Sequence, residues 1–286
     1  MRDKKVLLIG GAGFLGQSLI TSLLKERISV FYADLNPIEG LEQNFILLNI
    51  LEKNGFNNID KDFTTVINLT GQITNPSNLC FQLNTKGIHN IVDFIKENNI
   101  NLIQVSTLSV YGSSTIEVNE ESKLNPETPY GICKAIAEYL IQSQLSDVQF
   151  TIIRLSNLYG EKQPKGMLAY LMKNLKKRDK IFFNNDGSLR RHHLNVDDAA
   201  NILAQMSINF NSGLYNYPGN DVYSIKELIT LLEGIINTTL VVSYEKRKPW
   251  ENLAKVDSAK INITFNYKSQ TTLKNWLTKQ LIRNGY

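Results

Sequence analysis

Short apolar runs alternate with longer amphipathic stretches through the first half of the chain. Continuous apolar runs are typical of buried parallel strands, and apolar positions that repeat every three or four residues are typical of helices. The runs predict strands over residues 6–9, 29–33, 45–48, 65–69, 102–105 and 150–155. The stretches between them predict helices over residues 14–27, 79–98 and from 129 onward. This alternation predicts an α/β fold built on a doubly wound parallel sheet.

The pattern changes after Gly160, where short strands and helices follow one another less regularly. The run Ser224-Ile225-Lys226-Glu227 is a capping box that begins a helix. A helix over 197–207 is expected to pack back on the main sheet. We therefore predict one domain over residues 1–156 together with about 192–210. A smaller mixed α/β C-terminal lobe, residues 157–191 and 211–286, is expected to face it across a cleft.

Composition excludes several classes of protein. Of the 286 residues, 42% are apolar and 20% are charged, which is an ordinary globular balance. Lysine and arginine exceed aspartate and glutamate by 31 to 27, an excess too diffuse to predict binding to nucleic acid. The apolar run at 6–9 is too short for a signal peptide or a membrane span. Cys80 and Cys133 do not form a disulfide framework, and free thiols fit a reducing cytoplasm.

A glycine-rich turn follows the first predicted strand and opens the first predicted helix. Gly10, Gly13 and Gly16 have the spacing that allows a tight turn, a close backbone approach to a pyrophosphate and close packing of helix on strand. Phe14 and Leu15 belong to the same turn. The sequence thus predicts a Rossmann-like dinucleotide site.

Asp34 ends the second predicted strand, where a carboxylate accepts hydrogen bonds from the adenosine ribose and repels a 2′-phosphate. No lysine or arginine follows it in Leu35-Asn36-Pro37. This favours NAD over NADP.

Tyr130 and Lys134 are four residues apart and lie on one face of a predicted helix. Thr128 can cap this helix, with Pro129 at its first position. An ammonium group beside a phenol lowers the phenol pKa from about 10 toward neutrality. The pair therefore predicts a general base for a reaction at a hydroxyl group. A packed tyrosine and a surface lysine are the alternative interpretation.

Together these residues resemble the extended short-chain dehydrogenase/reductase family, in its nucleotide-sugar epimerase/dehydratase branch, over nearly the whole chain. Further segments carry the resemblance: 68–71, 84–87, 105–112, 129–134, 154–160, 191–198 and 247–250. Asp257, ten residues after Arg247, belongs to the same pattern as the last segment. The resemblance implies a Tyr-Lys-Thr mechanism with Tyr130, Lys134 and Thr107 as catalytic residues. Lys134 would also hold the nicotinamide ribose, and the charge of the nicotinamide would lower the pKa of Tyr130 further.

The resemblance also assigns the ligand contacts. It implies that NAD is bound by the glycine turn, Asp34, Tyr130 and Lys134, and by Asn49, Ile50, Leu69, Thr70, Gly71 and Asn84. It implies that the substrate diphosphate is met by Asn157, Arg191 and Arg247, with Arg190 as an alternative to Arg191. His192 and His193 have no cluster of acids or cysteines nearby, so we predict no metal site.

Three departures from the family pattern affect the expected activity. Asn49 stands where an aspartate usually contacts adenine, and Trp250 stands where an acid often binds the nucleotide ribose, with Glu251 as a candidate substitute. Thr107-Leu108-Ser109 lacks the Asp-Glu pair of sugar 4,6-dehydratases and the glutamate of uronic-acid decarboxylases. We therefore expect neither of those two reactions.

We expect the protein to be an NAD-dependent oxidoreductase. It would transfer a hydride at a hydroxyl of a nucleotide-diphosphate sugar, and C4 is the expected position. A 4-epimerase, which returns the hydride, and a dehydrogenase or 4-reductase, which does not, both remain open. A non-catalytic NAD-binding sensor or scaffold would not need Thr107, Tyr130 and Lys134 together. A reductase of a small free ketone would leave the predicted diphosphate residues without a ligand.

The altered nucleotide segment and the short second lobe favour a less common sugar, such as a deoxy-sugar or heptose of a surface-polysaccharide pathway. The resemblance also implies a cytoplasmic homodimer, joined by a four-helix bundle of the helices over 85–98 and 130–145. No nucleic acid or membrane partner is expected.

Overall fold

A single parallel sheet forms the centre of the molecule. The computed structural model describes residues 4–71, 75–177, 179–247, 251–283 and 285. Seven strands lie in the order β10-β6-β5-β4-β1-β2-β3, and every neighbouring pair is parallel. Their bounds are β1 Lys5–Ile9, β2 Ser29–Asp34, β3 Phe45–Leu47, β4 Thr65–Asn68, β5 Asn101–Thr107, β6 Phe150–Leu155 and β10 Gly213–Tyr217. The inner strands are buried on both sides, which is why they are continuous apolar runs.

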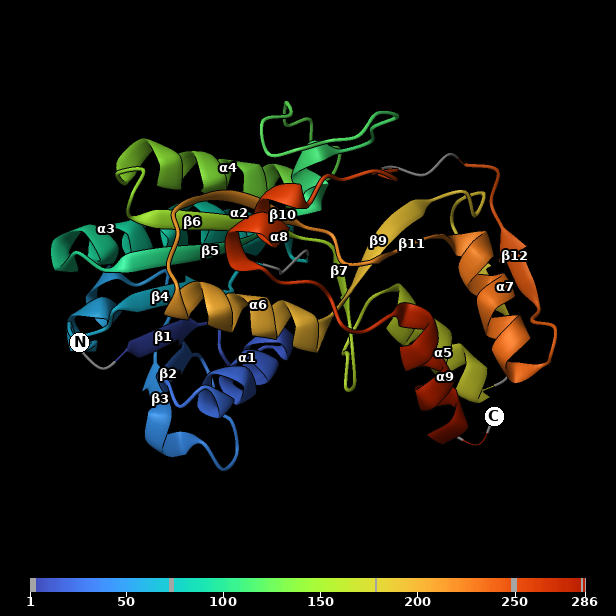
Figure 1. Cartoon of the computed structure of the whole chain (residues 1–286), viewed down its shortest axis with the longest axis horizontal. Coiled ribbons are helices and arrows are strands. Elements are labelled where there is room, and N and C mark those ends of the chain that lie inside the picture. The colour runs from blue at the N-terminus through green and yellow to red at the C-terminus, as the bar shows by residue number, and fades with distance from the viewer. Residues whose placement is uncertain (1–3, 72–74, 178, 248–250, 284, 286) are drawn as a thin grey trace.

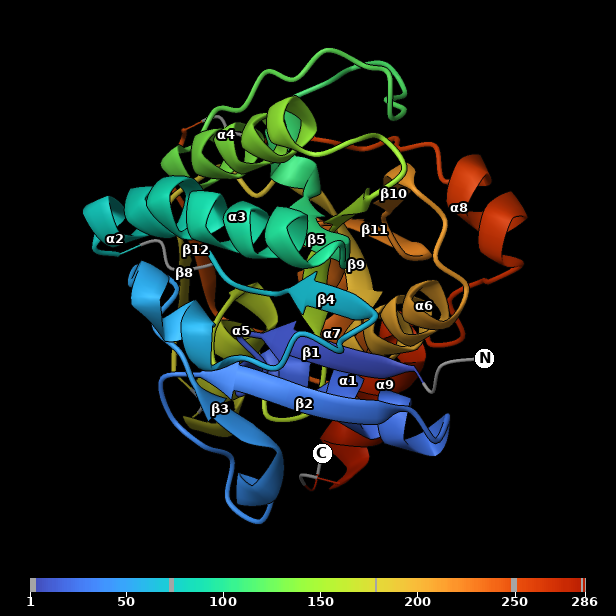
Figure 2. The ribbon, with the colours of Figure 1, turned by 90° about the vertical axis from the view of Figure 1, so that its left-hand side faces the viewer.

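Helices cover both faces of this sheet (Figure 2). One face carries α1 (Phe14–Lys25) and α6 (Val196–Ile208), which pack against each other in one apolar core. The other face carries α3 (Ile88–Asn98) and α4 (Pro129–Gln144), which form a second core with the strands beneath them. The short helix α2 (Ser77–Gln82) leads into α3 through a π-helical turn.

The smaller lobe lies beyond the carboxyl ends of the central strands (Figure 1). It contains a three-stranded sheet, β11-β9-β7, and a two-stranded sheet, β12-β8. The strands are β7 Asn157–Tyr159, β8 Ile181–Phe183, β9 Arg190–Asn195, β11 Asp221–Ser224 and β12 Val242–Tyr244. Its helices are α5 Met167–Lys177, α7 Ile225–Ile236 and α9 Leu273–Arg283, which share a core of their own. Helix α8 (Ala259–Phe265) packs instead beside β10.

The predicted fold class is confirmed: a Rossmann-like parallel sheet is joined to a smaller mixed lobe. Helix α6 packs on the main sheet as expected, and Ser224 forms the predicted capping box with Glu227. The helix predicted over 79–98 is divided into α2 and α3 by the π-helical turn. The division into two domains stays a prediction. Strand β10, which was assigned to the smaller lobe, pairs with β6 in the main sheet.

Two further observations concern the cysteines and the length of the helices. Cys80 and Cys133 are buried and are not joined in a disulfide. Within the described part of the chain, no helix combines the length and the apolar character needed to cross a lipid bilayer.

Candidate active site

A cavity of about 630 Å³ lies where the carboxyl ends of the central strands meet the smaller lobe. Ligands of open α/β sheets bind at this edge, outside the strand ends. The turn after β1, the end of β5, the start of α4 and strands β7 and β9 all contribute to the wall. The predicted site residues among its lining are Gly10, Gly13, Phe14, Leu15, Gly16, Leu69, Thr70, Thr107, Tyr130, Lys134, Asn157 and Arg191.

The glycine turn has the shape that a diphosphate requires. Gly10 has a positive φ of 83°, and a Cβ on Gly16 would lie 2.3 Å from the carbonyl oxygen of Gly11. Helix α1 begins after Gly13, and no side chain caps its first turn within the described residues. Backbone N–H groups at an uncapped helix start attract anions. The turn therefore fits the pyrophosphate of a dinucleotide.

Asp34 holds this turn in place. Its Oδ2 accepts a hydrogen bond from the Ala12 amide at 3.0 Å, and its Oδ1 accepts one from the Leu35 amide at 2.7 Å. Asp34 is outside the cavity lining, at the end of β2 beside the turn. Its position at the strand end agrees with the prediction. Its contact with the adenosine ribose stays a prediction.

Four other predicted cofactor residues are absent from the cavity lining. Asn49 donates to Glu52 at 2.8 Å, and Ile50 is buried against Gly87. The Asn84 amide donates to the carbonyl of Gly71 at 3.1 Å. The residues outside the lining are thus Asn49, Ile50, Gly71 and Asn84, and their contact with NAD stays a prediction.

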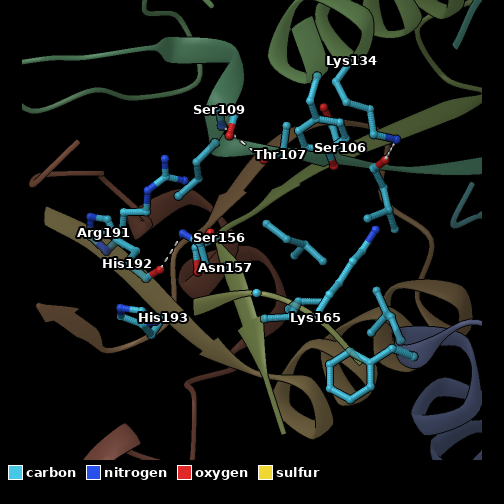
Figure 3. A pocket seen from close by; sticks show the side chains of 18 of the residues that line it. Ser106, Thr107, Ser109, Lys134, Ser156, Asn157, Lys165, Arg191, His192 and His193 are labelled. Atoms are coloured by element: carbon cyan, nitrogen blue, oxygen red, sulfur yellow. Dashed lines mark hydrogen bonds between the residues drawn. The ribbon is translucent and has the colours of Figure 1, made fainter. Parts of the chain in front are cut away.

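Thr107 and Lys134 lie near each other at one end of the cavity (Figure 3), and Tyr130, one helical turn before Lys134, also lines it. Helix α4 begins as predicted: Thr128 Oγ1 accepts a hydrogen bond from the Gly131 amide at 3.2 Å, and Pro129 is the first helical residue. Lys134 is 2% exposed, and its Nζ donates to the carbonyls of Thr70 and Val105, each at 2.9 Å. The lysine therefore fastens α4 to the ends of β4 and β5.

Burial changes the pKa values of both Tyr130 and Lys134. Burial lowers the pKa of Lys134 to about 8, and the nearby carboxylate of Glu138 opposes that effect. Burial also raises the pKa of the Tyr130 phenol, while a hydrogen bond with Thr107 acts in the other direction. The predicted lowering of the tyrosine pKa by Lys134 is wrong for this structure. The reason is that the phenol is desolvated and the ammonium is engaged by backbone carbonyls.

The smaller lobe supplies polar groups to the opposite end of the cavity (Figure 3). Asn157 Nδ2 donates to the carbonyl of His192 at 3.2 Å, and Arg191 Nη2 forms an ion pair with Glu251 at 3.0 Å. Arg191 Nε and His193 Nε2 are buried without a hydrogen-bond partner among the described residues. Arg190 pairs with Glu227 and is absent from the lining, so the structure favours Arg191.

Buried histidines line this end of the cavity. Burial lowers the pKa of both His192 and His193 to about 4, so the two rings are neutral at physiological pH. Among the residues that the structure describes, no group of three or more His, Cys, Asp or Glu side chains could hold a metal ion. The two histidines therefore shape the wall as neutral groups.

Arg247, which was also predicted to bind the diphosphate, lies outside the cavity lining. Arg247 is exposed, its carbonyl accepts a hydrogen bond from the Asp186 amide at 2.9 Å, and it is absent from the cavity lining. Lys248, Pro249 and Trp250, on which part of the resemblance rested, lie outside the described residues. Glu251 does line the cavity, and its Oε1 accepts a hydrogen bond from Thr128 Oγ1 at 2.6 Å.

Lys165 is a cavity residue that sequence reasoning missed. It lies on the loop between β7 and α5, and its side chain extends into the cavity toward the Lys134 side (Figure 3). The signal available in the sequence was a lysine between Pro164 and Gly166, shortly after Gly160. A cation on this loop adds positive charge to a cavity that already contains Arg191.

Comparison with known proteins identifies the family. Residues 6–217 match the model of the "NAD dependent epimerase/dehydratase family", which is well over half of the chain. The chain belongs to this family. NAD, the predicted cofactor, is the cofactor that the family model names.

Relatives of this epimerase/dehydratase family member have several activities. A "Putative UDP-glucose 4-epimerase" of Methanocaldococcus jannaschii is 28% identical over 268 residues, covering 86% of this chain and 87% of the relative. A dTDP-D-glucose 4,6-dehydratase of Dictyostelium discoideum is 30% identical over 231 residues, covering 68% of this chain and 53% of the relative.

Two solved structures share the fold along the whole chain. The UDP-glucuronic acid 4-epimerase of Bacillus cereus, in complex with UDP-glucuronic acid and NAD, has a TM-score of 0.83 at 22% identity, covering 99% of this chain and 100% of the other. The dTDP-glucose 4,6-dehydratase of Bacillus anthracis, in complex with NAD, has a TM-score of 0.84 at 22% identity, covering 99% and 97%. Identities this low establish the common fold.

The comparisons overturn one expectation. From the residues after Thr107, the sequence predicts neither 4,6-dehydration nor decarboxylation. The relatives include the D. discoideum dehydratase and a UDP-N-acetyl-alpha-D-glucosaminuronate decarboxylase of Bacillus cytotoxicus, 26% identical over 86% of this chain. That exclusion is wrong, because two residues of one loop are too small a part of the site to separate reactions within a family.

Proposed function

We propose that this protein uses NAD to oxidise the C4 hydroxyl of a nucleotide-diphosphate sugar. The observation that supports the proposal is that one cavity is lined by three groups of residues with different chemistry. The glycine turn lies on one side, Tyr130 and Lys134 at one end, and Arg191 at the other end. Membership of the epimerase/dehydratase family agrees with this arrangement.

The cofactor contacts follow from the residues that line the cavity. The glycine turn and the uncapped start of α1 would hold the NAD pyrophosphate, and Asp34 would hold the adenosine ribose. Lys134 would hold the nicotinamide ribose, beside the loop that carries Leu69 and Thr70. When bound, NAD supplies the hydride acceptor and a positive charge that lowers the pKa of the phenol.

Three side chains of the protein perform the proton transfer. Tyr130 takes the proton of the sugar hydroxyl as general base. Lys134, held by two backbone carbonyls, fixes the helix that carries the phenol and would donate to the nicotinamide ribose. Thr107 contacts the phenol and orients the reacting oxygen, which is positioning catalysis.

The opposite end of the cavity suits the diphosphate. The guanidinium of Arg191 is held by Glu251 and keeps a buried Nε without a described partner, which is free to donate to a phosphate oxygen. Asn157 lines the cavity near Arg191, and Lys165 adds a second cation to the lining. Arg247, which was predicted to join them, would need to reach the ligand from outside the present lining.

The M. jannaschii relative, which covers most of both chains, favours 4-epimerisation as the overall reaction. In that reaction the cavity would have to let the keto sugar turn, so that bound NAD could supply the reduction at the other face. A sensor or scaffold role would leave the convergence of Thr107, Tyr130 and Lys134 without use. A reductase of small free ketones would leave the Arg191 end of the cavity without a ligand.

The test uses the purified chain with added NAD and a panel of UDP-, dTDP- and GDP-sugars. The absorbance of the reduced cofactor is recorded, and the sugar products are separated by chromatography and identified by NMR. A C4 epimer without net NADH supports 4-epimerisation, and a 4-keto product with stoichiometric NADH supports net dehydrogenation. Absence of turnover and of binding with every sugar nucleotide would refute the proposal.

A further inference from the structure

The proposed catalytic helix α4 contacts β5 through residues spaced four apart. Tyr130 lies close to Thr107, whose hydroxyl acts to lower the pKa of the phenol, and Lys134 Nζ donates to the carbonyl of Val105 at 2.9 Å. Positions four apart lie on one helical face, one above the other. The next position on that face, Glu138, is fully buried and is not required for the proton transfer described above.

Glu138 contacts the residue of β5 that lies between the other two contacts. Its Oε1 accepts a hydrogen bond from Ser106 Oγ at 2.5 Å. Its Oε2 forms an ion pair with Arg154 Nη2 at 2.7 Å, and Arg154 Nε donates to both carboxylate oxygens. Ser106 and Arg154 are 3% and 2% exposed, so the cluster is almost fully buried, with Ser106 at the border of the cavity.

The cluster is part of a polar row that crosses the sheet. Ser106 of β5 is directly opposite Arg154 of β6, which is directly opposite Asn216 of β10. Arg154 also donates to the hydroxyl of Tyr111 at 2.6 Å, and that hydroxyl contacts the Asn216 side chain at 2.8 Å. Three neighbouring strands are therefore joined through one guanidinium, at the edge where the cavity opens.

Stability alone does not account for such a cluster. A buried ion pair costs desolvation energy, and well-packed apolar replacements are often neutral or stabilising. Directional bonds do what apolar contacts cannot: they set the rotation and the axial position of a helix on a sheet. A shift of one step along β5 would separate the phenol from its threonine partner.

We propose that Ser106, Glu138 and Arg154 are positioning residues that hold helix α4 in register with β5. In that register the hydroxyls of Tyr130 and Thr107 can both reach the reacting oxygen of the sugar. This inference rests on the proposed function. Ser106 borders the cavity, but its hydroxyl is engaged by Glu138, and Glu138 and Arg154 lie outside the lining, so the cluster acts through the residues that it places.

The direct test is Ser106→Ala, which removes the hydroxyl and leaves the Glu138–Arg154 ion pair in place. We expect kcat to fall by about tenfold to a hundredfold, the cost of a small misplacement of reacting groups. The KM for the sugar nucleotide and the Kd for NAD should stay within about twofold, because their ligands are unchanged. A kcat within about twofold of wild type would overturn the proposal.

Two further variants separate positioning from general damage. Ser106→Thr keeps the hydroxyl and should restore most of kcat. Ser207→Ala is the matched control, because Ser207 is 3% exposed and donates one hydrogen bond within α6, to the carbonyl of Ala204 at 2.7 Å. It should leave kcat unchanged. Equal losses in the two alanine variants would show a structural effect and contradict the inference.

A readout without turnover keeps this inference distinct from the proposed function. Tyrosine labelled with carbon-13 at Cζ is incorporated, and the Tyr130 resonance is assigned from Tyr130→Phe. Ser106→Ala should shift that resonance, and Ser207→Ala should not. If no sugar nucleotide is turned over, the proposed function fails while this result still stands. If the Tyr130 resonance does not shift in Ser106→Ala, the proposed positioning role is wrong.

Discussion

At the scale of single residues, the site is defined by groups whose charge depends on burial. Lys134 is inside the protein and keeps two carbonyl partners, while the Tyr130 phenol lies nearby in a desolvated environment. A lysine with a pKa of about 8 changes its charge close to physiological pH. The chemistry of this end of the cavity is therefore expected to respond to small changes of pH.

Replacing the proposed base gives the first prediction. Tyr130→Phe removes only the hydroxyl, so kcat should fall by about 10²–10⁴-fold, the usual contribution of general acid–base catalysis. The affinity for NAD should stay near that of the unchanged protein, because the phenol is one contact among many. Steady-state kinetics and a fluorescence titration with NAD measure both quantities. Full biological activity in this variant would instead support the sensor or scaffold alternative.

The pH dependence gives the second prediction. The proposed mechanism needs Lys134 as an ammonium, which is present below its pKa and is lost as the pH rises through about 8. The value of kcat/KM, which reports groups of the free enzyme, should therefore decline on the alkaline side of that value. Lys134→Arg should move the decline to higher pH, since a guanidinium keeps its proton. An unmoved decline in the variant would assign it to another group.

At the scale of elements, the start of α4 joins local structure to the site. Thr128 caps the helix by accepting from the Gly131 amide, and it donates to the buried carboxylate of Glu251. That carboxylate also holds Arg191 of the smaller lobe. One cap thus connects the helix that carries Tyr130 with the wall proposed for the diphosphate.

The third prediction concerns this cap. Thr128→Ala should reduce the free energy of unfolding by about 1 kcal/mol, the usual loss for an N-cap. It should also lower kcat/KM, because Glu251 loses a partner that helps to hold Arg191. Urea unfolding and kinetics measure the two effects. Ser224→Ala removes the cap of α7 away from the cavity, and it should cost similar stability with no change in kcat/KM.

At the scale of the whole molecule, an apolar face remains on the outer helices. Ile132 and Tyr139 of α4 are 46% and 70% exposed, and Phe81 of α2 is 52% exposed. The two α4 residues are seven apart and lie on one helical face. The homodimer through a four-helix bundle stays a prediction, and this face is where a second copy would pack.

The fourth prediction tests that dimer. The protein should sediment as a dimer in analytical ultracentrifugation, and Tyr139→Lys should shift it toward the monomer by burying a charge in the interface. Ile263→Lys is the control, because Ile263 of α8 is 81% exposed and lies on a different helix. A monomeric wild-type protein, or equal dissociation in both variants, would contradict the predicted interface.

Much of the fold was predictable because its signals are local. Alternating apolar runs, the glycine turn before α1 and the Thr128-Pro129 helix start depend on spacing within a few residues, and the structure contains each of them. The break between α2 and α3 was missed, because the apolar pattern continues through the π-helical turn. Strand β10 lies in the segment assigned to the smaller lobe, yet it pairs with β6 of the main sheet, because sheet partners far apart in the chain leave no local signal.

The sequence by itself determined the fold class, the dinucleotide turn and the Tyr130–Lys134 helix, since each follows from residue type and short spacing. Only the tertiary structure decided that Arg191 and Lys165 reach the cavity and that Arg247 does not. It also showed that burial opposes the expected effect of Lys134 on the phenol pKa. The physical reason is that desolvation and side-chain reach depend on how distant segments pack, and spacing along a chain does not encode either one.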